Sequence, residues 1–333
     1  MIVRRTVITA LALGLAAFAA TRSFAQQSPV NPQARGPHTD VIYGDDDRLD
    51  MWAVQSPALK AMAASTVGLF QSGSVSIKDG KATLSVESYG ESYGLCQDEP
   101  FRDQSAGAFC SGSLVAPDII MTAGHCVRSQ SACEGTKFVF GFAISAKGGA
   151  TPTSVPAGEV YSCTKLLGRE EVGTGADWAL VKLDRAVAGH APLKVNRSGA
   201  PAKGTPIIVI GHPAGLPTKV AGGASVREVK SGYFTANLDT YGGNSGSAVF
   251  NARTGQIEGI LVRGENDFVY DSANSCRRSN VCSADGCRGE DVTTIGSLVG
   301  NIPTAAGESL KAFTANPGPS LNSLKGLAGD SSR

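Results

Sequence analysis

The chain has 333 residues, of which 42% are hydrophobic and 18% charged, and its formal net charge is +1 at pH 7. This length suffices for one two-lobed domain or two small domains, and the near-neutral charge argues against a nucleic-acid partner bound through a basic face. With 41 glycines and only 6% aromatic residues, the composition favours short strands joined by many turns over a helical bundle.

The first 25 residues predict a signal peptide. Arg4 and Arg5 give a positively charged start, residues 7–20 are apolar, and Ser23 and Ala25 put small residues where a signal peptidase cleaves. The apolar run is shorter than the roughly 20 residues that a membrane span needs. We therefore expect a secreted or periplasmic protein, in which residues 26–40 form a polar pro-segment.

The body of the chain has the pattern of an all-β protein. From residue 65 onward, short apolar or alternating runs are separated by Gly, Pro, Asn and Ser, which predicts a barrel or a sandwich. Residues 57–64 predict the one helix of the body, and residues 304–333, poor in apolar side chains, predict a loose tail. The clearest strand-like runs are residues 82–86, 112–115, 119–122, 138–142, 178–183, 207–210, 248–250 and 257–262.

All of the cysteines follow the predicted signal peptide. An even number in an exported chain favours disulfides, here four. The alternative is a zinc site built from the last three, which is disfavoured because they form no Cys-x-x-Cys pair and have no histidine nearby. The eight are Cys96, Cys110, Cys126, Cys133, Cys163, Cys276, Cys282 and Cys287.

Three segments carry residues suited to nucleophilic catalysis. His125 follows an apolar strand, Asp177 begins a buried strand, and Ser245 lies in a glycine-rich turn before another strand. A serine hydroxyl needs a base to accept its proton, histidine is the side chain that titrates near neutral pH, and a carboxylate fixes the tautomer of the imidazole. The three residues therefore predict a catalytic triad.

The turn around Ser245 also offers groups that could stabilise an oxyanion. Its glycines let the backbone turn so that the amides of Gly243 and Ser245 point toward one place. The other common hydrolase motif, Gly-x-Ser-x-Gly, does not match, because Ser247 stands where its second glycine is required.

These motifs resemble the trypsin/chymotrypsin superfamily of serine peptidases. The resemblance extends over residues 41–302 and is strongest at 109–115, 122–126, 177–183 and 239–249. It implies two antiparallel six-stranded β-barrels, at about residues 65–185 and 200–300 of a peptidase domain spanning 41–303, with the active site in the cleft between them. It also implies polypeptide substrates and neither cofactor nor metal, and we expect a monomer.

Within the superfamily, residues 41–48 and 242–247 are similar to the mature start and the nucleophile turn of bacterial glutamyl endopeptidases. This similarity implies that the mature chain begins at Val41, after cleavage of the bond that follows Asp40. Self-processing with a preference for acidic residues is one hypothesis for that cleavage. Asn244 stands where trypsin-type zymogens have the aspartate that binds the new N-terminus, so we expect no activation through that salt bridge.

The preference at the scissile bond stays open between acidic and basic side chains. Asp239 matches the position of the carboxylate with which trypsins select Lys or Arg, whereas Arg263 is a cation on the expected wall of the pocket. Leu261 stands where glutamyl endopeptidases have a histidine. The two charges could also neutralise each other or be structural. The pocket residues implied by the resemblance are Asp239, Thr240, Leu261, Val262, Arg263 and Gly264.

The superfamily commonly bridges the cysteines that correspond to Cys110 and Cys126, and we expect this disulfide first. A Cys133–Cys163 disulfide around the strand-like run at 138–142 is the second expectation, and the pairing of the other four cysteines stays open. The leading interpretation of the chain is an exported serine endopeptidase. The alternatives are a catalytically silent peptide-binding module and an esterase with the same triad.

Overall fold

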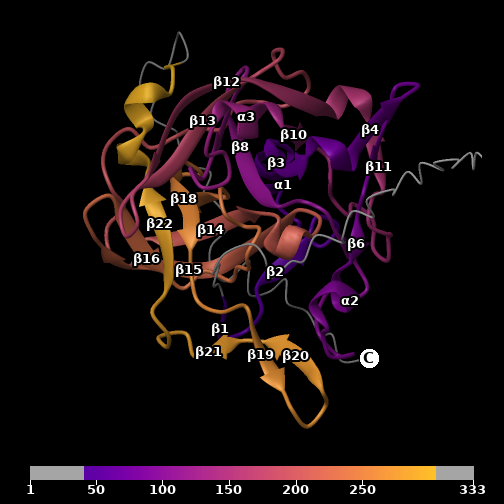
Figure 1. The fold of residues 1–333 in the computed structure, drawn as a ribbon. Coiled ribbons are helices and arrows are strands. Elements are labelled where there is room, and N and C mark those ends of the chain that lie inside the picture. The colour runs from indigo at the N-terminus through magenta and orange to yellow at the C-terminus, as the bar shows by residue number, and fades with distance from the viewer. Residues whose placement is uncertain (1–40, 305–333) are drawn as a thin grey trace, which may run out of the picture. The chain divides into compact units, whose positions relative to one another are not determined.

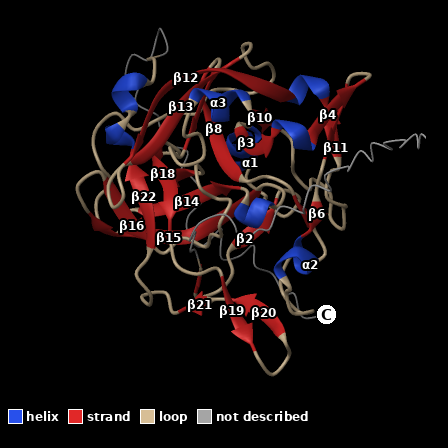
Figure 2. Cartoon of the chain, viewed as in Figure 1, coloured by secondary structure: helices blue, strands red, loops and turns tan. Residues whose placement is uncertain are grey.

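The computed structural model describes residues 41–304, drawn as ribbons in Figures 1 and 2. The predicted signal peptide, the predicted pro-segment and the predicted tail beyond residue 304 lie outside the described residues. Within residues 41–304, no helix is long and apolar enough to cross a membrane.

Six strands close into a first barrel. Their order around the barrel is β10-β12-β13-β9-β8-β3, and β3 pairs back with β10. All neighbouring strands are antiparallel. The strands are β3 (Thr66–Gln71), β8 (Cys110–Ala116), β9 (Ile119–Thr122), β10 (Thr136–Val139), β12 (Val160–Glu171) and β13 (Asp177–Leu183).

Six later strands close into a second barrel, coloured orange to yellow in Figure 1. Their order is β14-β17-β18-β22-β16-β15, β15 pairs back with β14, and the short β2 (Arg48–Asp50) joins the edge of β15. The predicted fold class of two six-stranded antiparallel barrels is therefore confirmed. The strands are β14 (Pro206–Gly211), β15 (Lys219–Val229), β16 (Tyr233–Ala236), β17 (Ala248–Asn251), β18 (Ile257–Arg263) and β22 (Glu290–Thr294).

The chain forms several smaller sheets and turns in addition to the two barrels. Three strands form one small sheet, and the remaining short strands form pairs, of which β19–β20 is a hairpin at the bottom of Figure 1. The small strands are β4 (Val75–Lys78), β5 (Lys81–Leu84), β11 (Ser154–Pro156), β6 (Glu87–Ser88), β7 (Ser105–Ala106), β19 (Phe268–Asp271), β20 (Cys276–Ser279), β1 (Ile42–Tyr43) and β21 (Val281–Cys282). The 3₁₀ turns are η2 (Ser72–Ser74), η3 (Ala157–Glu159), η4 (Pro213–Gly215), η5 (Ile295–Ser297) and η6 (Val299–Asn301).

The predicted helix at residues 57–64 is present as α1 (Pro57–Ala64). Ser56 caps it by accepting a hydrogen bond from the Leu59 amide, and proline at its start suits the fixed φ of the first turn. Two five-residue helices, α2 (Tyr89–Tyr93) and α3 (Gln130–Glu134), were not predicted. They are too short to show a helical period and depend on serine caps. The predicted run at 138–142 ends early as a strand because Gly141 adopts a φ of +73°.

The two barrels share a core and are joined by hydrogen bonds. One cluster of buried apolar side chains includes Leu114 and Val181 of the first barrel and Phe250 and Ile260 of the second. The amide of Asp177 donates to Thr293 Oγ1 at 3.0 Å, and this hydroxyl donates back to the Asp177 carbonyl at 3.0 Å. The start of β13 is thus fixed to β22 at the line where the barrels meet.

Candidate active site

The strand pairing of the first barrel brings His125 and Asp177 together. His125 lies in the turn that follows β9, and Asp177 is the first residue of β13, which pairs antiparallel with β9. Because the strands are antiparallel neighbours, the end of one lies beside the start of the other. The turn that carries His125 also packs tightly against the neighbouring strand β12: a Cβ atom at Gly124 would lie 2.1 Å from the carbonyl oxygen of Glu170.

The carboxylate of Asp177 holds His125 at two atoms. His125 Nδ1 lies 2.7 Å from Asp177 Oδ2, and the His125 amide donates to Asp177 Oδ1 at 3.1 Å. Burial acts to raise the pKa of Asp177, but the hydrogen bonds and the charge of His125 outweigh it and lower this pKa below its ordinary value. A charged Asp177 keeps the proton of a neutral imidazole on Nδ1, which leaves Nε2 to act as a base.

Ser245 comes from the second barrel, in the turn before β17. Two backbone bonds close the turn: the Asn244 amide donates to the Tyr241 carbonyl and the Ser247 amide to the Asn244 carbonyl. The Gly246 amide donates to the Leu261 carbonyl of β18. Gly246 has a φ of +90°, and a Cβ atom there would lie 2.1 Å from the carbonyl oxygen of Ser111 in β8. The turn is therefore seated against the first barrel.

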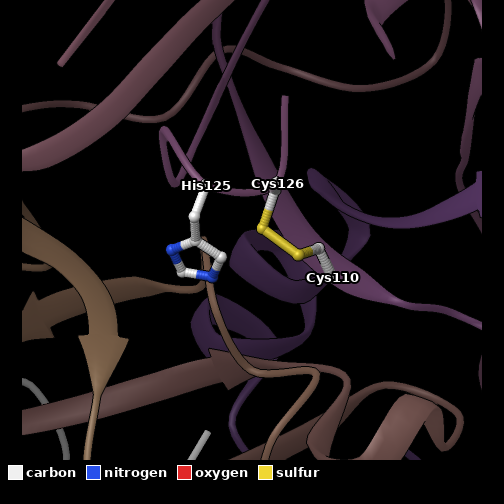
Figure 3. A group of neighbouring side chains, drawn as sticks. All are labelled: Cys110, His125 and Cys126. Carbon is white, nitrogen blue, oxygen red and sulfur yellow. A yellow bond between two sulfur atoms is a disulfide. The ribbon is translucent and has the colours of Figure 1, made fainter. Parts of the chain in front are cut away.

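Contacts through Cys126 place Ser245 next to the residue pair of the first barrel. The Cys126 Sγ atom lies 3.6 Å from the Ser245 carbonyl oxygen. A ring nitrogen of His125 and the Sγ atoms of Cys110 and Cys126 lie within 4.8 Å of one another, and Figure 3 shows the imidazole beside the Cys110–Cys126 disulfide. The structure therefore brings His125, Asp177 and Ser245 to one place, where the two barrels meet.

The two amides predicted to bind an oxyanion are available to donate hydrogen bonds. Within residues 41–304, neither the Gly243 amide nor the Ser245 amide donates to a protein acceptor. Gly243 has a φ of +98°, and a Cβ atom there would lie 2.7 Å from the Gly215 amide nitrogen. Only glycine fits this turn, whose free amides can stabilise a developing negative charge.

Asp239 faces the N-terminal segment. It is only 3% exposed, and its two carboxylate oxygens accept the amides of Tyr43 and Asp47 at 2.7 and 2.8 Å. Burial raises the pKa of Asp239 to about 7, although the two amide bonds act to lower it. Next to it, Thr240 is buried, and its amide donates to the Val41 carbonyl at 3.3 Å.

Arg263, the predicted cation of the pocket wall, is bound by acceptors. Its Nε atom lies 3.2 Å from Asp291 Oδ2, and a terminal nitrogen donates to the Gly175 carbonyl at 2.8 Å. The other terminal nitrogen lies 4.0 Å from Asp177 Oδ2. Arg263 therefore adds positive charge beside Asp177, and this charge is balanced by the carboxylates of Asp177 and Asp291.

The other predicted pocket residues belong to β18 and the residue after it. Leu261 and Val262 are 1% exposed, and Gly264 is also buried. The Leu261 backbone pairs with the nucleophile turn, donating to the Ser247 carbonyl at 3.0 Å. These residues thus lie against the turn that carries Ser245, and their role in specificity stays a prediction.

All of the cysteines are paired. The structure has the two expected disulfides, Cys110–Cys126 and Cys133–Cys163. The pairing left open by the sequence is Cys96–Cys276 and Cys282–Cys287. Both groups of three potential metal ligands within residues 41–304 include one of these disulfides, whose sulfurs are not available as thiolate ligands.

Neither Ser111 nor His212 was singled out from the sequence. His212 is fully buried, its Nδ1 lies 2.9 Å from the Leu216 carbonyl oxygen, and burial lowers its pKa to about 4. Asn244 Oδ1 accepts the Ser247 hydroxyl at 3.1 Å, and the absence of activation through a salt bridge at this position stays a prediction. No local pattern predicts the contacts of the Ser111 hydroxyl, because its partners Gly243 and His212 lie more than 100 residues away along the chain.

Comparisons with known proteins agree with the predicted resemblance. Residues 110–260 match the trypsin-like peptidase domain family. A glutamyl endopeptidase of Bacillus licheniformis is 27% identical over 150 residues, which are 42% of this chain and 45% of the relative. An extracellular metalloprotease of Bacillus subtilis is 31% identical over 154 residues, which are 44% and 48%. The chain thus spans less than half the length of these curated relatives.

Two solved structures are also similar to this chain. A Glu endopeptidase has a TM-score of 0.44 and 20% identity, with 78% of this chain and 98% of that chain covered. The active form of the Rv3671c protease from M. tuberculosis has a TM-score of 0.42 and 15% identity, with 81% and 92% covered.

Proposed function

We propose that this chain, which carries a trypsin-like peptidase domain and resembles the trypsin/chymotrypsin superfamily, is a serine endopeptidase that works through an acyl-enzyme on Ser245. The observation that carries the proposal is the meeting of a His125–Asp177 pair from one barrel with a glycine-rich serine turn from the other. The two unpaired amides of that turn support it.

In the first half of the proposed reaction, Ser245 Oγ attacks the carbonyl carbon of the scissile peptide bond while His125 Nε2 takes the hydroxyl proton. The negative charge moves to the carbonyl oxygen, which the amides of Gly243 and Ser245 stabilise. Asp177 stabilises the imidazolium through the Nδ1 proton. The C–N bond then breaks, His125 gives its proton to the leaving amine, and an ester with Ser245 remains.

In the second half, water replaces the amine. His125 takes a proton from the water as its oxygen attacks the ester carbonyl, and a second tetrahedral oxyanion forms at the same two amides. The C–O bond to Ser245 breaks, His125 returns the proton to Ser245 Oγ, and a carboxylic acid leaves. No cofactor enters either half of this scheme.

For specificity, we propose that Asp239 is an anchor for residues 43–47 and not a reader of basic side chains. Both of its oxygens already accept backbone amides, so a substrate ammonium would have to compete with them. Arg263 is similarly engaged by Asp291. We therefore expect no selection of Lys or Arg at the scissile position, and acidic preference stays ahead of basic.

Export and maturation belong to the same proposal. The four disulfides within residues 41–304 fit an oxidising compartment. A mature start at Val41 is compatible with the burial of that residue and with its backbone bond to Thr240. The signal peptide and the cleavage after Asp40 stay predictions.

A serine-directed fluorophosphonate tests the function, because it reacts covalently only with an activated serine. We expect one label per chain, located on Ser245 by peptide mapping and absent from Ser245→Ala. Ser113→Ala is the matched control, and it should label like the wild type. Ser113 is a buried serine whose hydroxyl has no hydrogen-bond partner within residues 41–304. An unlabelled wild type would favour the silent peptide-binding module, and labelling with turnover of esters but not peptides would favour the esterase.

A further inference from the structure

Ser111 joins the two barrels directly behind the nucleophile turn. It follows Cys110 in β8 and is fully buried. Its amide donates to the Ser245 carbonyl at 2.8 Å, and its carbonyl accepts the Thr122 hydroxyl at 2.7 Å. Its hydroxyl donates to the Gly243 carbonyl at 2.8 Å and accepts the amide of His212 at 2.9 Å. Every polar group of this residue therefore has a partner.

Hydrogen bonds from Ala214 and from Ser111 hold the peptide planes on the two sides of Gly243. The plane before it contains the Gly242 carbonyl and the Gly243 amide, and this carbonyl accepts the Ala214 amide at 2.6 Å. Because a trans peptide directs its N–H and C=O to opposite sides, this bond aims the Gly243 amide away from Ala214. The plane after it contains the Gly243 carbonyl, which the Ser111 hydroxyl holds.

The hydrogen bonds that hold these two peptide planes matter because residue 243 is a glycine, whose backbone is the least restricted. With no Cβ and a φ of +98°, its backbone has little intrinsic reason to keep one orientation. The Ser111 hydroxyl also binds the first residue of the 212–215 segment that supplies the Ala214 amide. The Ser111 hydroxyl therefore acts on both peptide planes: it binds the Gly243 carbonyl directly, and through the His212 amide it holds the segment whose Ala214 amide binds the Gly242 carbonyl.

We propose that Ser111 is a positioning residue for the oxyanion site, whose hydroxyl fixes the direction of the Gly243 amide from behind the turn. The inference rests on the proposed function and adds to it a residue outside the triad and the nucleophile turn. Ser111 touches neither substrate nor the reacting atoms. Its contribution is preorganisation, which acts on the transition state more than on the bound substrate.

The test compares Ser111→Ala with Ser113→Ala. Both replace a buried serine of β8, but among the described residues only the Ser111 hydroxyl has hydrogen-bond partners. We expect Ser111→Ala to lower kcat about 10- to 100-fold, somewhat less than loss of an oxyanion donor itself, with KM changed less than about threefold. Affinity for a peptide boronate, which forms a tetrahedral adduct on the serine, should fall in proportion to kcat. Ser113→Ala should change neither.

Ser111→Cys is the second variant, nearly equal in size and with a weaker donor, and it carries the test if the alanine variant does not fold. It should give a smaller loss of kcat with the same Tm as the wild type. An active wild type together with unchanged kcat and boronate affinity in folded Ser111 variants would overturn the inference alone. Peptidase activity that survives in Ser245→Ala would instead overturn the proposed function.

Discussion

Two buried aspartates show how the immediate surroundings decide the charge of a residue. Asp177 and Asp239 are both 3% exposed, and burial pushes the pKa of each upward. At Asp177 a histidine that can become cationic reverses the effect. At Asp239 the partners are neutral amides, and the charges of Asp46 and Asp47 raise the pKa further. One carboxylate is thus suited to stabilise an imidazolium, and the other to hold a loop.

Asp239→Asn tests the anchoring role at this scale. Because an amide group can accept only at its oxygen, the variant loses one of the two backbone bonds, and we expect the free energy of unfolding to fall by about 1–3 kcal/mol. The ratio of cleavage rates for paired peptides with Glu or Lys at the scissile position should stay within about threefold of the wild-type ratio. The contradicting result is a clear wild-type preference for Lys that disappears in the variant.

At the residue scale, the sequence predicted those residues that stand in recognisable local motifs. The triad candidates stand in distinctive short motifs, and the structure gathers them. The partners of Asp239 could not be predicted, because Tyr43 and Asp47 lie nearly 200 residues away from it along the chain. The same limit hid the role of Ser111: it lies in a segment of the resemblance, but the partners of its hydroxyl are more than 100 residues away along the chain.

At the scale of elements, the segment that includes η4 supports the nucleophile turn. Ala214 has a left-handed φ of +52° and donates to the Gly242 carbonyl, a conformation that an alanine adopts only under constraint. The constraint comes from its ends: the His212 amide is bound by Ser111, and the His212 ring is bound by the Leu216 carbonyl. Strand periodicity predicted β14 before this segment but not the turn itself.

His212 makes this element sensitive to acid. Burial lowers its pKa to about 4 from an ordinary value of 6.5, so between these two pH values the unfolded chain binds a proton that the folded chain excludes. The free energy of unfolding should therefore fall as the pH drops from 6.5 to 4, by up to about 3 kcal/mol from this residue. Asp239 acts in the opposite direction over a similar range, because its folded-state pKa is raised to about 7.

Urea unfolding at pH 4.5, 5.5, 6.5 and 7.5 isolates the His212 contribution when the wild type is compared with His212→Asn. Asparagine retains an N–H donor for the Leu216 carbonyl but does not titrate. The wild type should lose more stability than the variant between pH 6.5 and 4.5. Equal losses would contradict a neutral, buried His212.

At the scale of the whole molecule, apolar periodicity and turn residues predicted an all-β body, and the resemblance supplied its division into two barrels. Neither could predict how residues 41–50 attach. These residues pair with β21 and β15, and the Arg48 guanidinium, which is bound to Asp46, lies 4.1 Å from the centre of the Tyr241 ring. The strand pairings and the contact with Tyr241 join the start of the described chain to its second half, so no local window contains both partners.

The same long-range assembly explains why the proposed active site needs both barrels. His125 and Asp177 come from the first and Ser245 from the second, and their relative position depends on the shared core and on the bonds of Ser111 and Thr293. We therefore expect the site to form only when the two barrels fold together.

The turnover of Ser245→Ala tests the central claim most directly. Purified wild type and variant are compared on an unfolded protein substrate, after equal Tm values have shown that both are folded. Loss of the nucleophile should reduce kcat by about 10⁶, leaving only the contributions of binding and of the oxyanion amides. A folded Ser245→Ala protein that keeps more than about one tenth of the wild-type turnover would contradict catalysis through Ser245.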